Sequence, residues 1–237
     1  VPTVRDLSTS TAFVTGANRG LGRHLAAELV RRGATVYAGA RDPRSVDLAG
    51  VTPVQLDVTD PASVAAAAAA APGVDLLVNN AGSSTGADLL TSPLDDLRVE
   101  LETHYLGSLA VTRAFLPSLV EHGGAVANVL SALSWVSFPA VGAYAAAKSA
   151  AWSMTNGIRQ ELAPRGVTVT ALHVGYMDTE MAAGVQDPKS DPADVARALL
   201  DAVAAGAHEV LFDDVSRQVQ QGLAGGVGAL YPQLDAA

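Results

Sequence analysis

A serine, a tyrosine and a lysine are the side chains best suited to chemistry in this 237-residue sequence. Tyr144 and Lys148 stand four residues apart in YAAAK, so on a helix they share one face. A carbonyl carbon that accepts a hydride leaves an alkoxide, which needs a proton. A free tyrosine has a pKa of about 10 and is too weak an acid at neutral pH, but a nearby ammonium group lowers that pKa.

Ser131 lies 13 residues before Tyr144, directly after an apolar run typical of a strand. Its hydroxyl could donate a hydrogen bond to the substrate oxygen and stabilise the charge that develops there. Each of the three residues alone also fits an ordinary surface or turn position. Together, at these spacings and behind the turn described next, they indicate a catalytic set.

A glycine-rich turn, TGANRGLG from Thr15 to Gly22, joins the first predicted strand to the first predicted helix. A pyrophosphate at a helix N-terminus needs close backbone approach and free N–H groups. Glycines permit both because no Cβ blocks the ligand. The spacing is G-x-x-x-G-x-G, not the commoner G-x-G-x-x-G. A plain strand–helix turn is the alternative, but the position after the first strand favours a phosphate site.

The end of the second predicted strand bears on which dinucleotide binds. An NAD enzyme usually places an acid there to bind the ribose 2′-hydroxyl, whereas this chain has Ala40 followed by Arg41. Arg41 and Arg19 can clamp a 2′-phosphate with charge-assisted hydrogen bonds. The negative charge of Asp42, the next residue, disfavours a bound 2′-phosphate. Alternatively, both arginines could be solvated surface residues. We expect a preference for NADP(H).

Short apolar runs alternate with helix-length segments along the whole chain. The predicted strands cover residues 11–15, 35–38, 54–56, 75–79, 125–130, 167–173 and 209–212. The predicted helices cover residues 21–32, 61–71, 93–122, 143–163 and 192–205. This alternation predicts βαβ units, and the continuous apolar strands predict a sheet buried on both faces. We expect one α/β domain over 1–237, a Rossmann-like doubly wound parallel sheet of about seven strands flanked by helices, with ligands at the carboxyl ends of the strands.

These motifs resemble those of the short-chain dehydrogenase/reductase family over roughly residues 10–182. The glycine turn resembles the family's cofactor turn, Asn79–Gly82 (NNAG) resembles a motif that braces the sheet, and Ser131, Tyr144 and Lys148 match its catalytic set. The resemblance implies an NADP(H)-dependent oxidoreductase similar to carbonyl reductases. Tyr144 would then be the general acid in reduction and the general base in oxidation, and Lys148 would also hold the nicotinamide ribose.

The resemblance also implies which residues bind the cofactor. These are Gly16, Asn18, Arg19, Gly20, Leu21, Gly22, Arg41, Asp57, Val58, Asn80, Ala81, Gly82, Tyr144, Lys148, Met177 and Thr179. Asp57 and Val58 match the pair that contacts adenine, although DVTDP is also ordinary turn chemistry. Met177 and Thr179 belong to the loop that contacts the nicotinamide amide.

The chain departs from the family pattern at three places. His104 stands where the family has an asparagine that organises a water-linked proton relay, and Val174 stands where the family has a proline. Leu130–Ser131 replaces a frequent Ser–Ser pair. The imidazole of His104 could substitute for the amide and titrate near pH ~6.5, or it could simply be satisfied by a neighbouring carbonyl.

Composition excludes several classes of protein. The net charge of −9 and pI near 4.9 argue against a nucleic-acid ligand. There is no cysteine, which excludes disulfides and thiolate metal sites and fits a cytoplasmic location. The longest bland stretch, Ala65 to Ala71, is far shorter than the roughly 20 apolar residues of a membrane span. Residues 1–10 have no apolar core, so we expect no signal peptide.

The residues name no single substrate. A substrate lid is expected over about 176–192, and Trp135, Phe138, Val141 and Tyr176 could form an apolar wall suited to a medium-sized ketone or aldehyde. A 3-oxoacyl reductase and a hydroxysteroid or sugar-alcohol dehydrogenase stay open, although the negative charge disfavours an acidic acyl-carrier partner. The alternative outside enzymes is an NADP(H)-binding sensor or scaffold without turnover. The resemblance implies that the helical segments 93–122 and 143–163 form the surfaces between subunits, so we expect a homodimer or homotetramer.

Overall fold

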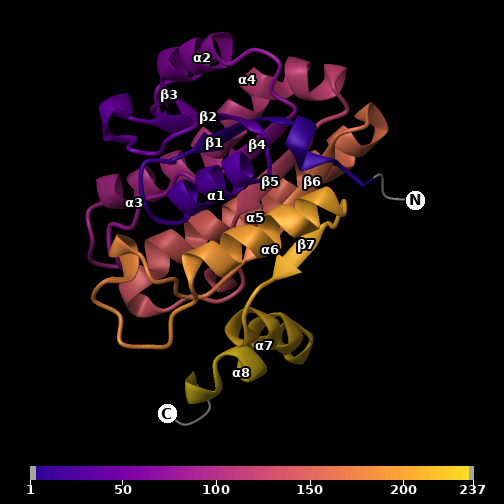
Figure 1. Ribbon diagram of the computed structural model, residues 1–237. Coiled ribbons are helices and arrows are strands. Elements are labelled where there is room, and N and C mark those ends of the chain that lie inside the picture. Colours follow the sequence, from indigo (N-terminus) through magenta and orange to yellow (C-terminus); the bar gives the residue numbers. More distant parts are fainter. Residues whose placement is uncertain (1–3, 235–237) are drawn as a thin grey trace.

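One seven-stranded sheet lies at the centre of the computed structural model, which describes residues 4–234 (Figure 1). The strand order is β3-β2-β1-β4-β5-β6-β7, and every neighbouring pair is parallel. The strands are β1 (Thr11–Thr15), β2 (Thr35–Ala40), β3 (Val51–Gln55), β4 (Leu76–Asn79), β5 (Ala125–Val129), β6 (Thr168–His173) and β7 (Glu209–Leu211). The order reverses between β1 and β4, which is where doubly wound sheets bind ligands. This confirms the predicted fold class.

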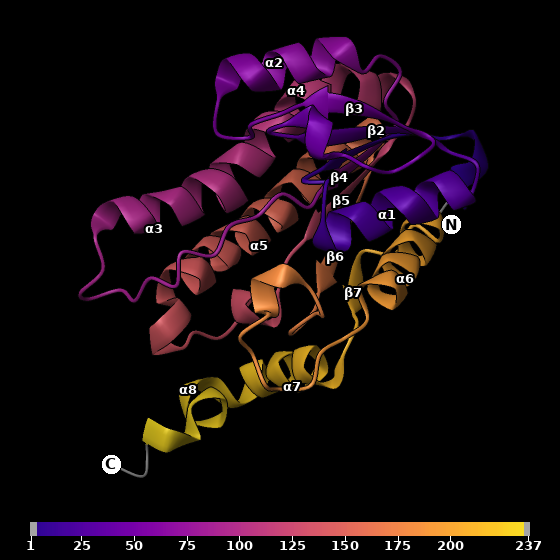
Figure 2. The same ribbon diagram turned by 60° about the vertical axis from the view of Figure 1, so that its left-hand side comes forward.

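Helices cover both faces of the sheet, as Figure 2 shows. One face packs against α1 (Gly20–Arg31) and α6 (Pro192–Ala204), and the other against α2 (Pro61–Ala70), α4 (Ser108–Glu121) and α5 (Gly142–Leu162). Successive strand residues point to opposite faces, so Val14 and Leu76 enter the first core while Phe13 and Leu77 enter the second. Both layers therefore depend on the same apolar strands.

The third strand differs from its prediction over residues 54–56. It covers Val51–Gln55 and includes Pro53. It lies at the edge of the sheet, where a proline needs no partner for its missing N–H. The predicted strand began three residues too late in the sequence. Only Val54 of the five residues of β3 is buried, so the apolar pattern that marks a strand is weak there.

The predicted helix over 93–122 is three consecutive segments. It consists of α3 (Leu94–Leu101), a π-helical turn (Glu102–Gly107) and α4. Such a turn inserts extra backbone into a helix and often occurs at functional sites. Here it carries His104.

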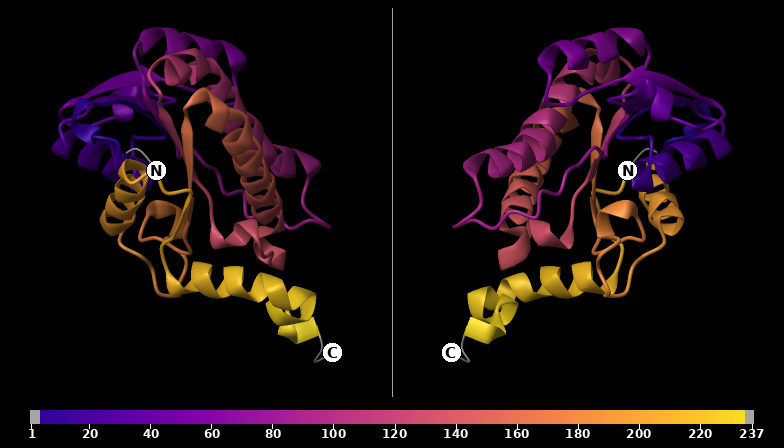
Figure 3. Two further views of the ribbon diagram at one scale, coloured as in Figure 1. Left: turned by 90° about the vertical axis from the view of Figure 1, so that its right-hand side faces the viewer. Right: turned by 90° about the vertical axis from the view of Figure 1, so that its left-hand side faces the viewer.

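Two C-terminal helices were not predicted, α7 (Asp214–Gly222) and α8 (Gly226–Leu230). Figure 3 shows them at the end of the molecule opposite α2. Their short and polar or glycine-rich sequences give little helical signal. Within residues 4–234, no helix has both the length and the apolar character that crossing a bilayer requires.

Candidate active site

A cleft of ≈ 1110 Å³ opens at the carboxyl ends of the strands. Its lining includes every residue that the sequence analysis assigned to the catalytic set or to the cofactor. The loops after β1, β2, β4, β5 and β6 bring these residues together from segments far apart in the chain. The predicted residues thus share one site.

The glycine turn is shaped for a phosphate group. Gly16 and Gly20 have φ angles of 66° and 51°, in the left-handed region that favours glycine. A Cβ on Gly22 would overlap the carbonyl oxygen of Gly16. Helix α1 begins after Arg19 with no side chain capping its N-terminus. Its first N–H groups are therefore available to an anion.

The NNAG segment holds this turn in place. The hydroxyl of Thr15 accepts hydrogen bonds from the backbone N–H groups of Asn80 and Ala81, each at 2.9 Å. The side-chain amide of Asn80 donates to the carbonyl of Thr15 at 2.9 Å. β1 and β4 are neighbours, so the motif connects the two strands at the switch point of the sheet.

The two predicted arginines line the same end of the cleft. Arg19 pairs with Glu180 of the expected lid, with 2.6 Å between Nη1 and Oε2, and both side chains are largely exposed. The carboxylate of Asp42 accepts hydrogen bonds from the backbone and side chain of Arg44, so it is already neutralised locally. Among residues 4–234, Arg41 takes part in no ion pair. The arrangement presents two guanidinium groups to a ligand.

Ser131 follows β5, and Tyr144 and Lys148 lie on α5. The Lys148 ammonium lies 5.5 Å from the centroid of the Tyr144 ring and donates to the carbonyl of Val129 at 2.8 Å. Lys148 is 5% exposed, and burial lowers its pKa to about 8. The three residues therefore converge on one point of the cleft.

The electrostatics of Tyr144 differ from the sequence-based expectation. Burial, and then the negative charge of Glu100, raise the pKa of Tyr144 above its ordinary value. The hydrogen bond with Ser131 acts in the opposite direction and is outweighed. Burial also lowers the pKa of Lys148, to about 8, and the lowering of the Tyr144 pKa that the motif suggested does not prevail over burial of the phenol.

His104 forms a buried pair with Glu100, a residue that the sequence analysis missed. Their nearest side-chain atoms are 3.3 Å apart, and the His104 ring meets the Tyr144 ring edge to face at a centroid distance of 5.0 Å. His104 Nε2 also lies 3.0 Å from the carbonyl oxygen of Ser83. Two ionisable residues four apart in one helix were the available signal.

Within this pair, Glu100 carries a negative charge. Glu100 is fully buried and accepts hydrogen bonds from Ser83 Oγ and the backbone N–H of Thr85. Burial acts to raise the pKa of Glu100, but the hydrogen bonds from His104, Ser83 and Thr85 outweigh it and lower the pKa to about 2. Burial lowers the pKa of His104. A carboxylate thus lies beside a neutral imidazole.

The expected apolar wall is not part of the cleft. Trp135, Phe138, Val141 and Tyr176 are absent from its lining within the described residues, and Trp135 instead stacks on His173. Met177 and Met181 line the cleft on the lid side. Trp135, which the sequence suggested as a substrate contact, packs against the imidazole of His173 instead.

Known proteins resemble this chain over most of its length. The short chain dehydrogenase family model matches residues 10–190. A 1-deoxy-11-beta-hydroxypentalenate dehydrogenase of Streptomyces avermitilis is 34% identical over 201 residues, which cover 78% of this chain and 74% of that protein.

Solved structures of short-chain dehydrogenases are also similar to this chain. A short chain dehydrogenase from Burkholderia cenocepacia in complex with NADP is 40% identical, with a TM-score of 0.92 over 97% of this chain and 99% of that one. A short-chain dehydrogenase from Streptomyces avermitilis is 28% identical, with a TM-score of 0.84 over 96% and 97% of the two chains. The chain belongs to the short-chain dehydrogenase family of oxidoreductases.

Proposed function

We propose that this chain is an NADP(H)-dependent oxidoreductase that interconverts ketones or aldehydes and alcohols. The observation that carries the proposal is the convergence of the glycine turn, both arginines and the Ser131–Tyr144–Lys148 set on one cleft. The similar Burkholderia protein, which is 40% identical, has been solved with NADP. That neighbour supports the same cofactor here.

Each proposed role uses a group already in position. The N-terminus of α1 holds the pyrophosphate, Arg19 and Arg41 hold the 2′-phosphate, and Lys148 holds the nicotinamide ribose. The nicotinamide, when bound, supplies or accepts the hydride. Tyr144 gives its proton to the substrate oxygen in reduction and takes it back in oxidation, while the Ser131 hydroxyl stabilises the developing charge.

The lid proposed over about 176–192 would shield the reacting atoms from water. Thr179 already lies against the glycine turn, because a Cβ placed on Gly20 would sit 3.6 Å from its methyl group. Residues 180–182 form a short 3-10 helix at the mouth of the cleft. Through Met177 and Thr179, this segment would contact the nicotinamide amide.

The direct test is a titration with NADPH and, separately, with NADH, followed by a panel of carbonyl compounds. We expect tighter binding of NADPH and loss of its reduced-nicotinamide absorbance with at least one ketone or aldehyde. Tight binding without turnover on a broad panel would instead support a cofactor-dependent sensor. Equal affinity for both dinucleotides would contradict the arginine clamp.

A homodimer or homotetramer formed through the helical segment 93–122 and α5 is part of the proposal. The segment YAAAKSAA on α5 would let helices approach closely because its side chains are small. Light scattering at micromolar concentration should give a multiple of the 24.1 kDa chain mass. A single species at the chain mass would contradict this.

A further inference from the structure

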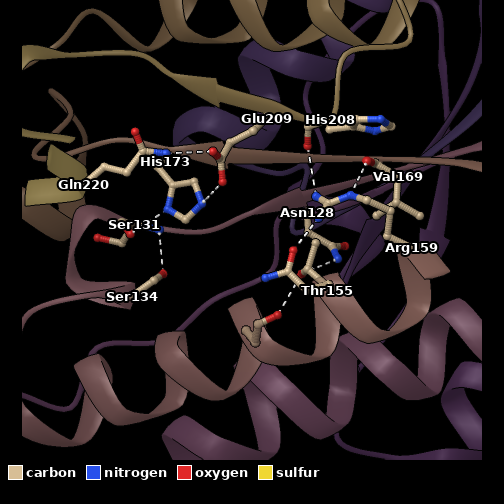
Figure 4. A network of polar contacts seen from close by, with 12 residues as sticks. Asn128, Ser131, Ser134, Thr155, Arg159, Val169, His173, His208, Glu209 and Gln220 are labelled. Carbon is tan, nitrogen blue, oxygen red and sulfur yellow. Dashed lines mark hydrogen bonds and ion pairs between the residues drawn. The ribbon is translucent and has the colours of Figure 1, made fainter. Parts of the chain in front are cut away.

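The imidazole of His173 lies next to Ser131, as Figure 4 shows. His173 is the last residue of β6 and is fully buried. Its Nδ1 lies 3.1 Å from the backbone carbonyl oxygen of Ser131. A carbonyl can only accept, so Nδ1 carries the proton and donates it to Ser131. None of the proposed chemical steps uses this residue.

The segment after Ser131 folds around the same ring. The indole of Trp135 stacks on His173 with 3.8 Å between ring centroids and an angle of 12°. The Ser131 N–H points to Ser134 Oγ at 3.3 Å, and the Ser131 hydroxyl accepts from the N–H of Leu133 at 3.1 Å. Because its oxygen already accepts this bond, the hydroxyl proton is directed elsewhere. His173 therefore supports the turn that determines where that hydroxyl points.

The other side of the ring faces the C-terminal part of the chain. His173 Nε2 lies 3.3 Å from a carboxylate oxygen of Glu209 on β7. The second carboxylate oxygen of Glu209 accepts a hydrogen bond from Gln220 of α7 at 3.0 Å (Figure 4). With its proton on Nδ1, the neutral ring has none on Nε2, so Nε2 makes no hydrogen bond to Glu209 and the hydrogen-bonded support of Ser131 ends at His173.

A second contact joins α7 to the cleft independently. Asp213, the N-cap of α7, accepts a hydrogen bond from Ser216 within the helix and another from the backbone N–H of Gly175 at 2.6 Å. Gly175 lines the cleft beside Val174. Helix α7, which the sequence did not predict, thus contacts the Gly175 segment of the cleft.

We propose that His173 is a positioning residue for the Ser131 hydroxyl. The inference rests on the proposed role of Ser131. His173 acts through the serine and does not touch the substrate. Its removal changes the rate of the chemical step and leaves the distant adenosine end of the cleft intact.

The test compares His173→Leu, which has no donor, with His173→Asn, whose amide N–H can reach the same carbonyl. We expect His173→Leu to lower kcat by about 10- to 100-fold, as small misplacements of reacting groups do, with the Kd for NADPH unchanged. His173→Asn should recover most of kcat. Circular dichroism melting verifies that each variant is folded.

A double-mutant cycle separates positioning from general structural damage. In a Ser131→Ala background, His173→Leu should lower kcat no further, because residues that act as one unit are not additive. A full additional loss in that background, or wild-type kcat in His173→Leu, would overturn the inference while leaving Ser131 catalytic. Unchanged turnover in Ser131→Ala alone would overturn the proposed role of Ser131, and the inference with it.

Discussion

Two buried histidines flank the proposed catalytic residues, and each faces a glutamate at the same distance. His104 and Glu100 are 3.3 Å apart within one helical segment, and His173 and Glu209 are 3.3 Å apart across two strands. The carboxylate of Glu100 is fully buried, whereas the Glu209 side chain is 32% exposed. Water therefore screens one negative charge and not the other.

This difference in exposure shows that a histidine facing a glutamate can have two different roles in the same protein. The unscreened charge of Glu100 reaches Tyr144 and raises its pKa. Glu209 does not contribute to the Tyr144 pKa, and its partner His173 contacts the backbone of Ser131 instead. We infer that the first pair sets the electrostatics of proton transfer, whereas in the second pair the histidine alone sets the geometry of the serine.

The largest expected effect comes from removing the group on which the first pair acts. Tyr144→Phe should lower kcat by about 10²- to 10⁴-fold, the usual contribution of a positioned acid–base group. The Kd for NADPH should be unchanged because the phosphate contacts lie elsewhere. Steady-state kinetics and fluorescence titration measure the two quantities. Wild-type turnover in this variant would remove Tyr144 from the mechanism.

The two pairs should also destabilise the protein in different acid ranges. Glu100 has its pKa lowered from 4.5 to about 2, so its stabilisation is complete above pH 4.5 and is lost as the pH falls towards 2. His173 has its pKa lowered from 6.5 to about 4, chiefly by burial, so protons favour the unfolded state between these values. Each corresponds to about 3 kcal/mol of the free energy of unfolding.

Urea unfolding across pH tests this separation. His173→Asn should flatten the dependence of the unfolding free energy between pH 4 and 6.5, and Glu100→Gln should flatten it between pH 2 and 4.5. Each variant serves as the control for the other. The comparison fails if both variants flatten the same range.

A smaller effect is expected on the pH profile of the oxidation direction. Glu100→Gln removes the charge that raises the Tyr144 pKa, so the rise of kcat/KM with pH should move to lower pH by about one unit. Glu209→Gln neutralises the screened carboxylate and should leave the position of the profile unchanged. Identical profiles in all three proteins would show that Glu100 has no electrostatic role.

The smallest effect concerns the end of the cleft remote from both pairs. Arg41→Ala should weaken NADPH binding by about tenfold, the scale of one charge-assisted hydrogen bond, and NADH binding much less. Arg23→Ala is the control, because Arg23 pairs with the exposed carboxylate of Asp47 and neither residue lines the cleft. Equal weakening of both dinucleotides by Arg41→Ala would argue against a 2′-phosphate contact.

Much of the fold could be predicted because its signals are local. Five-residue apolar strands and helices ending at glycine or proline depend on neighbours in the chain. The third strand was misplaced because Pro53 is tolerated only at an edge, and edge position is a property of the whole sheet. The helix over 93–122 was predicted without its π-helical turn, which packs beside α5 and is not visible in hydrophobic spacing.

The glycine turn and the proposed Tyr144–Lys148 pair could be predicted from the sequence alone, because residues 16–22 and 144–148 lie at short spacings whose geometry the local backbone sets. The sequence also determined that Glu100 and His104 can meet, since they are four apart in a helix. Only the tertiary structure decided that Glu100 is sealed from water. It alone also brought Glu209 to His173, through the parallel pairing of β6 with β7. Burial and long-range pairing depend on the assembled sheet, and no spacing along the chain encodes them.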